Sequence, residues 1–209
     1  MSFEEDFEDW LEIREPKGDV NRQSMNMHQC AVVGDKFMRK LTSGDKVARR
    51  KWSKLLQKRK ATGEPYIIFI DTVNRLIPQH HKLAGLNVKT SNLCSEITLP
   101  TGIDKDGKDR TAVCCLSSLN IEKYDEWKDD QNFISDIMRF LDNVLTDFIE
   151  NAPEQFRDAK YSAMKERSVG LGVMGLHSFF QQKNIPLESV MSKVWNKKIF
   201  EYIQKKVDE

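Results

Sequence analysis

The 209-residue chain combines 31% charged with 39% hydrophobic residues, as is typical of a globular domain with a sizeable core. Its 33 Lys and Arg nearly balance its 32 Asp and Glu, so charge gives no reason to expect a nucleic acid or an anionic membrane as the main partner. The longest apolar runs are too short to span a bilayer, and the acidic start at 1–6 lacks the pattern of a signal peptide. We therefore expect a cytoplasmic location.

Hydrophobic periodicity in the first third of the chain predicts helices and short apolar segments. The predicted helices cover 3–13, the surroundings of 37–41, and 46–61, an apolar patch lies at Cys30–Val33, and a strand is predicted at 66–70. The helix at 46–61 carries eight Lys or Arg residues, which we interpret as the solvated face of an amphipathic helix. A nucleic-acid-binding stripe is the alternative. Helix, Gly/Pro turn and apolar strand in this order are typical of an α/β fold.

The rest of the chain changes from extended segments to helices. Extended segments are predicted at 88–99 and 111–119, and Asp106-Gly107 between them is a turn signal. An apolar i, i+4 stripe predicts a helix over 129–150, closed by Pro153. The stripe consists of Phe133, Ile137, Leu141, Leu145 and Phe148, and further helices are predicted at 154–166, 174–183 and 188–207.

Three local patterns suggest ligand sites, and each has a simpler interpretation. The segment 170–175 fits G-x-G-x-x-G, but the polar residues before it do not predict the strand that a dinucleotide fingerprint requires. We interpret it as a tight turn entering a closely packed helix. His28 near Cys30, and the histidine pair at 80–81, lack the paired ligand units of zinc sites, and 104–107 lacks ligands of a calcium loop. No metal site and no bound cofactor are predicted for this segment.

The segment Asn92-Leu93-Cys94-Ser95-Glu96 places an amide, a thiol and a carboxylate at every second position. In an extended backbone these three side chains face one side and could converge on a small polar substrate. Full extension would separate Asn92 from Glu96 by roughly 13 Å, so a functional arrangement requires a curved loop. An edge strand with incidental polar residues is the alternative interpretation.

This segment resembles the active-site finger loop of class I ribonucleotide reductase large subunits, because residues 91–97 reproduce that family's N-L-C-x-E-I motif. Segments 63–74, 112–120 and 167–176 resemble the flanking parts of the family in the same order. The resemblance implies an α/β fold that is part of a ten-stranded barrel of the ribonucleotide reductase and glycyl-radical type. We expect 1–209 to form one segment of that barrel, with the family's N-terminal and C-terminal parts outside it. A split gene, as in phages, or a truncation would explain such a segment.

The resemblance also implies roles for the polar residues of the motif. Cys94 would become a thiyl radical that takes the 3′ hydrogen atom of a ribonucleotide, and Glu96 would act as the general base on the 3′ hydroxyl. Asn92, together with Ser91, would bind the substrate. Cys114 matches one of the family's two reducing thiols. We interpret the remaining cysteines, Cys30 and Cys115, as packing residues, and the scattered spacing of all four does not predict a disulfide framework.

The expected function is the reduction of ribonucleoside diphosphates to 2′-deoxyribonucleotides for DNA synthesis. The implied partners are the remaining large-subunit segments, a radical-generating small subunit that contains metal, and thioredoxin or glutaredoxin as the reductant. Nucleotide effectors of this allosteric, ATP-binding enzyme would bind outside the segment, which we expect to be inactive alone. A non-catalytic protein that binds or regulates an intact reductase is the alternative. A glycyl-radical or adenosylcobalamin-dependent relative is a weaker third interpretation.

Overall fold

The computed structural model describes residues 7–15, 17–21 and 23–209, and these form two compact units. The N-terminal unit ends at Arg110, and the C-terminal unit begins at Thr111. Each unit has its own hydrophobic core and its own parallel strand pair. That 1–209 is one barrel segment stays a prediction, whereas helices that alternate with parallel strands confirm the α/β class.

The N-terminal unit is built on two short parallel strands joined by helices. Its first elements are α1 (Phe7–Glu12), the 3-10 helix η1 (Gln23–Asn26), β1 (Cys30–Val33), α2 (Asp35–Thr42), α3 (Lys46–Thr62) and β2 (Tyr66–Phe69). The strands pair from Cys30 opposite Tyr66 to Val33 opposite Phe69, because α2 and α3 form the crossover that parallel strands require. The predicted helix at 3–13 is confirmed from Phe7 to Glu12, and its residues 3–6 lie outside the described residues.

The core of the N-terminal unit lies where α1, α2 and α3 pack on β1. It consists of Phe7, Leu11, Ala31, Val33, Phe37, Ala48 and Leu55. Leu55 of α3 is completely buried, whereas Lys54 beside it is paired with Glu8 of α1 at 2.5 Å. The prediction of an amphipathic helix with a solvated basic face is therefore confirmed, and the absence of a nucleic-acid partner stays a prediction.

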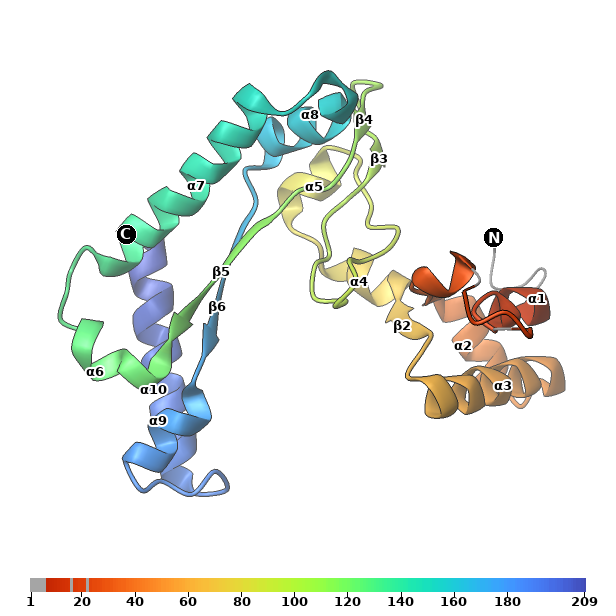
Figure 1. Ribbon diagram of the computed structural model, residues 1–209, viewed down its shortest axis with the longest axis horizontal. Helices are drawn as coiled ribbons and strands as arrows, with labels where there is room; N and C mark the ends of the chain where they lie inside the picture. The colour runs from red at the N-terminus through yellow and green to blue at the C-terminus, as the bar shows by residue number, and fades with distance from the viewer. Residues whose placement is uncertain (1–6, 16, 22) are drawn as a thin grey trace. The chain divides into compact units, whose positions relative to one another are not determined.

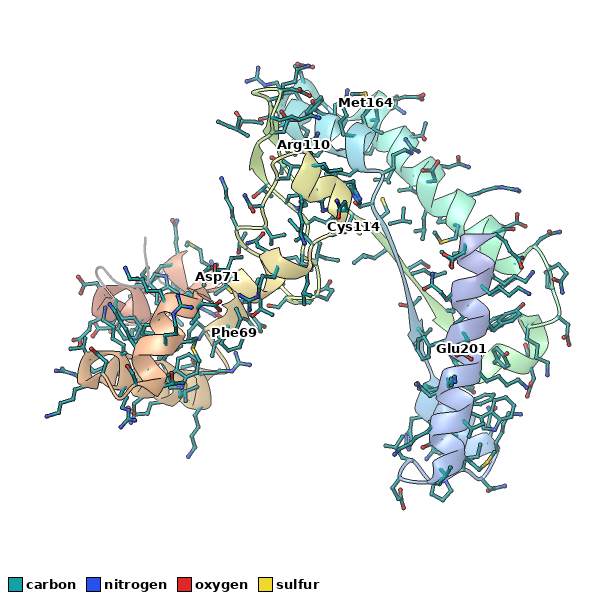
Figure 2. All side chains as sticks on the ribbon, turned by 180° about the vertical axis from the view of Figure 1, so that it is seen from behind. Phe69, Asp71, Arg110, Cys114, Met164 and Glu201 are labelled. Carbon is teal, nitrogen blue, oxygen red and sulfur yellow. The ribbon has the colours of Figure 1, made fainter. Side chains whose placement is uncertain are left out.

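Two short helices and a hairpin complete the N-terminal unit. They are α4 (Ile70–Leu76), α5 (Gln79–Leu83), β3 (Gly102–Ile103) and β4 (Asp109–Arg110). Helix α4 begins directly after β2, so the predicted strand at 66–70 ends one residue too late. Asp71 in the first turn of α4 accepts a hydrogen bond from the backbone N–H of Asp35 at 2.7 Å, which ties α4 to the start of α2. Figure 2 labels Asp71 at this junction.

The segment 88–99 does not form the predicted extended run. It contains no strand and turns back on itself near Cys94. The turn predicted at Asp106-Gly107 is confirmed, with Gly107 at a φ of 74° between β3 and β4. The Asp104 carboxylate accepts hydrogen bonds from the backbone N–H groups of Asp106 (2.9 Å) and Lys108 (3.1 Å) and from Arg110 Nε (2.9 Å). The hydrogen bonds that Asp104 accepts therefore stabilise the hairpin.

The C-terminal unit is built on a longer parallel pair. Its elements are β5 (Cys115–Asn120), the 3-10 helix η2 (Ile121–Lys123), α6 (Tyr124–Trp127), α7 (Phe133–Asn151), the 3-10 helix η3 (Glu154–Phe156), α8 (Arg157–Glu166), β6 (Val169–Met174), α9 (Leu176–Gln182) and α10 (Val190–Asp208). Strands β5 and β6 run side by side (Figure 1), in a one-to-one register from Cys115 opposite Val169 to Asn120 opposite Met174.

The glycine-rich segment 170–175 differs from its prediction. Its residues up to Met174 belong to β6, because pairing with β5 satisfies their backbone hydrogen bonds. Only Gly175, at a φ of 77°, makes the tight turn into α9. The interpretation as a turn was therefore wrong for most of the segment. Helix α9 begins at Leu176, two residues after the start predicted at 174.

The core of the C-terminal unit is rich in aromatic residues. It consists of Leu119, Ile121, Tyr124, Trp127, Ile134, Phe179, Phe180, Ile199 and Ile203. Leu141 and Leu145 of the predicted stripe are buried in α7, which begins at Phe133 and not at 129. Ile134, which the i, i+4 spacing omits, is also buried. Within the described parts of both units, no helix is long and apolar enough to span a membrane.

Candidate active site

The loop 91–97 is curved by hydrogen bonds within itself. The backbone carbonyl of Asn92 accepts a bond from the N–H of Ser95 at 3.1 Å, and Ser95 has a left-handed φ of 65°. The Asn92 side chain spans the turn, because its Oδ1 accepts from the N–H of Ile97 at 3.1 Å and its Nδ2 donates to Glu96 Oε1 at 2.7 Å. Asn92 and Glu96 thus meet directly, which an extended strand does not allow.

Ser91 closes the base of the loop. Its hydroxyl oxygen lies 2.6 Å from the backbone carbonyl of Ile97, to which it donates, and 3.2 Å from Asn92 Oδ1. A hydroxyl has one proton to donate, so the shorter contact defines its role here. The predicted role of Ser91 in binding substrate stays a prediction.

Cys94 lies at the exposed tip of the loop. Residues 92–96 are all exposed, and Leu93 keeps 52% of its surface in contact with solvent. None of the four cysteines, all of which lie in the described part of the chain, forms a disulfide. The loop therefore presents an accessible thiol next to a carboxylate that is oriented by an amide.

Asn74 of α4 holds the segment that leads into this loop. Its Nδ2 donates to the carbonyl of Val88 at 2.9 Å, and its Oδ1 accepts from the N–H of Val88 at 2.8 Å. The same Nδ2 lies 3.1 Å from the carbonyl of Ile70. Val88 is only 1% exposed, so water cannot replace these bonds without opening the structure. Sequence reasoning missed this role, although Asn74 lies in a segment that resembles the reductase family.

A charged cluster centred on Glu64 anchors the starts of β1 and β2. The Glu64 carboxylate pairs with Arg14 and accepts bonds from His28 Nδ1 at 2.6 Å and from the N–H of Gln29 at 3.1 Å. Burial alone would raise the pKa of Glu64, but the hydrogen bonds from Arg14, Gln29 and His28 lower it to about 2. His28 is therefore held by a hydrogen bond within this cluster.

A cavity of about 490 Å³ adjoins the first residues of the loop. Ser91 and Asn92 line one part of it, and Trp10, Cys30 and Tyr66 line another. Burial raises the pKa of the Cys30 thiol, which favours its neutral form. A neutral, half-buried thiol fits the predicted packing role of Cys30.

Cys114 belongs to the C-terminal unit, where it directly precedes β5 (Figure 2). It is half-buried, and its Sγ lies 3.8 Å from the carbonyl oxygen of Cys115. Alternation along the strand places Cys115 on the side of the buried Leu119, so the two neighbouring thiols face opposite ways, as predicted. Burial raises the pKa of Cys115. The loop gathers Ser91, Asn92, Cys94 and Glu96 in one unit, and Cys114 lies in the other.

A family model described as the barrel domain of ribonucleotide reductase matches residues 44–207. The chain belongs to this family. The ribonucleoside-diphosphate reductase large subunit of Invertebrate iridescent virus 3 is 46% identical over 152 residues, which cover 73% of this chain and 23% of that protein. The large subunit of Invertebrate iridescent virus 6 is 56% identical over 115 residues, which cover 55% of this chain and 12% of that protein.

A solved member of the ribonucleotide reductase family shares the fold. The class Id ribonucleotide reductase alpha subunit of Actinobacillus ureae superposes with a TM-score of 0.81 at 35% identity, covering 96% of this chain and 37% of that chain. The chain therefore has the ribonucleotide reductase barrel fold, and it spans less than half the length of each of these three relatives.

Proposed function

We propose that the chain is a catalytic segment of a ribonucleoside-diphosphate reductase large subunit, which reduces ribonucleoside diphosphates to 2′-deoxyribonucleotides. The observation that carries this proposal is the 2.7 Å hydrogen bond between Asn92 and Glu96 on the loop that exposes Cys94. Membership of the reductase family supports it. In the assembled enzyme, the loop 91–97 serves as the finger loop of a ten-stranded barrel. The short parallel sheets leave strand edges to which further strands of the large subunit can pair.

The three side chains of the loop divide the first step between them. Cys94, as a thiyl radical, takes the 3′ hydrogen atom of the ribose and becomes a thiol. Glu96 accepts the proton of the 3′ hydroxyl, and a proton from one of the two reducing thiols lets the 2′ hydroxyl leave as water. The Asn92 amide orients the Glu96 carboxylate and contacts the substrate, so that both reacting groups face the same sugar. The radical comes from a small subunit that contains metal.

The second step needs two reducing equivalents. Cys114 supplies one of two thiols, and each thiol gives one electron and one proton as the pair becomes a disulfide. Glu96 returns its proton to the 3′ oxygen, and Cys94 returns its hydrogen atom to C3′, which restores the thiyl radical. Thioredoxin or glutaredoxin is the reductant of the whole enzyme and restores the two thiols by thiol exchange. The half-buried position of Cys114 supports this role, because it limits reaction with other oxidants.

The decisive experiment measures deoxyribonucleotide formation by the chain combined with the remaining large-subunit segments and the small subunit. Cys94→Ser should lower turnover by at least about a thousandfold, since a serine hydroxyl cannot form the equivalent radical, and Glu96→Gln by about a hundredfold or more. Cys30→Ser is the matched control and should stay within about twofold of wild type. Turnover that survives Cys94→Ser would refute the proposal.

The same assay tests the alternative of a non-catalytic regulator. A chain that adds no activity in this mixture, yet binds tightly to an intact large subunit and alters its rate, would support regulation over catalysis. Reduction by the chain alone would show that it needs no complementing polypeptide.

A further inference from the structure

One face of the β5–β6 sheet is nearly bare of side chains on β6. Leu116 lies opposite Gly170, and Ser118 lies opposite Gly172. We call the surface formed by Cys114, Leu116, Ser118, Gly170 and Gly172 the glycine face. Neither glycine has a positive φ, so the backbone conformation does not require glycine at these positions. The space around each glycine shows whether a side chain would fit there.

At Gly170 that space is already occupied. A β-carbon there would lie 2.5 Å from Leu116 Cδ2, far below the normal carbon contact distance of about 3.5–4.0 Å. It would also lie 3.8 Å from Cys114 Sγ. Leu116, which is 54% exposed, therefore lies across β6 where a side chain of residue 170 would stand, so such a side chain would displace Leu116, and the Cys114 sulfur borders the same space.

Gly172 is different, although it lies on the same face of the same strand. A β-carbon there would lie 3.3 Å from Ser118 Oγ and 3.7 Å from the carbonyl oxygen of Ser117. A small rotation of the exposed Ser118 would accommodate it. The two glycines therefore form a matched pair, in which only Gly170 is tied to the surroundings of Cys114.

We propose that Gly170 is a positioning residue for the Cys114 thiol. By lacking a β-carbon it lets Leu116 lie across β6 and leaves the space beside the Cys114 sulfur without a side chain of residue 170. The importance of that space for reduction rests on the proposed function, because thiol exchange depends on the direction from which a sulfur can be approached. Cys115, which faces the other way, is not held by this contact.

The test measures how fast iodoacetamide alkylates Cys114 in the full 209-residue chain. All variants carry Cys115→Ser, so that the tryptic peptide 111–123 contains one thiol, and each rate is divided by the rate in urea. Gly170→Ala should change this ratio by at least about threefold, since thiol reactivity follows local exposure. Gly172→Ala should leave it within about 1.5-fold. Cys94, in the peptide 90–105, is the internal reference and should not respond.

A compensating variant separates this effect from general unfolding. In a chain that carries Leu116→Ala the clashing atoms are absent, so adding Gly170→Ala should leave the Cys114 ratio within about 1.5-fold of that of Leu116→Ala alone. Equal changes in the two glycine variants, a threefold effect of Gly170→Ala that persists beside Leu116→Ala, or a Cys114 that reacts as fast in the folded chain as in urea would overturn the proposal. The assay does not involve turnover. Loss of the proposed function would instead appear as full reductase activity in Cys114→Ser, with the alkylation result unchanged.

Discussion

The loop that carries Cys94 and the strand that follows Cys114 define the surroundings of their thiols by different interactions. The loop is exposed and is shaped by side-chain hydrogen bonds, chiefly those of Asn92. Cys114 instead precedes a six-residue strand in a regular parallel ladder, where Leu116 occupies the space that a side chain at Gly170 would fill. The geometry of the loop should therefore be sensitive to the loss of a hydrogen-bond donor or acceptor. The geometry around Cys114 should be sensitive to a change in side-chain volume.

The largest effect is expected where the loop loses its central amide. Asn92→Ala removes the bonds to Glu96 and to the N–H of Ile97, so turnover of the assembled reductase should fall by about a thousandfold. Asn92→Asp would place a second carboxylate where the amide now donates to Glu96, so turnover should fall at least as far as in Asn92→Ala. The exposed Thr98→Ala is the control. Turnover within about twofold of wild type in either Asn92 variant would contradict the role of Asn92 in orienting Glu96.

Packing in the C-terminal unit is tested by truncating α7. Leu145 is completely buried, so Leu145→Ala should lower the free energy of unfolding by about 3 kcal/mol, measured by urea denaturation. Val144→Ala, one residue away and 39% exposed, should cost less than about 1 kcal/mol. An equal loss of unfolding free energy in the two variants would show that Leu145 does not pack in the core.

The attachment of the loop is tested at Asn74. Asn74→Ala leaves both backbone groups of the buried Val88 without their partners and should cost about 2 kcal/mol. Hydrogen exchange at the Val88 amide should accelerate, and alkylation of Cys94 should change with it. Asn151→Ala removes only an exposed bond to Asp147 and is the control. Unchanged exchange at Val88 would show that Asn74 does not hold the loop.

The smallest effect concerns Glu64 and depends on pH. Its pKa is about 2 in the folded chain against an ordinary value of 4.5, so its stabilisation is complete above pH 4.5 and is lost as the pH falls toward 2. Glu64→Gln should cost about 1 kcal/mol near pH 7, because Gln keeps one acceptor oxygen, and the cost should shrink by more than half at pH 3. The exposed Glu188→Gln should show no such pH dependence. A cost that grows on acidification would exclude the anchoring role.

The sequence predicts the long helices well, because their signal is local. The stripes in α3, α7 and α10 repeat every three or four residues and need no partner to be recognised. Strand β6 was missed because glycines weaken its strand signal and its pairing partner, β5, lies far away in the sequence. The bend at 92–96 replaced a predicted extended run because side-chain hydrogen bonds, which periodicity does not detect, outweigh the alternating pattern.

The candidate site was predictable where its residues are neighbours in the sequence. Asn92, Cys94 and Glu96 lie within one five-residue motif, so their spacing alone indicates that they act together. The supporting residues were not predictable, because Asn74 acts on Val88 and Gly170 acts on Leu116 through contacts that only folding creates.

Strands β5 and β6 pair in an unbroken register. The geometry around Cys114 therefore does not depend on the length of the segment that connects the two strands. Residues 121–168 connect the end of β5 to the start of β6. The pairing of the two strands therefore does not depend on the length of this connection. The stretch 129–132 within it is exposed, and additional residues there would extend the crossover without shifting Leu116 against Gly170. An affinity tag or fluorescent label inserted at this point would therefore leave the surroundings of the Cys114 thiol unchanged.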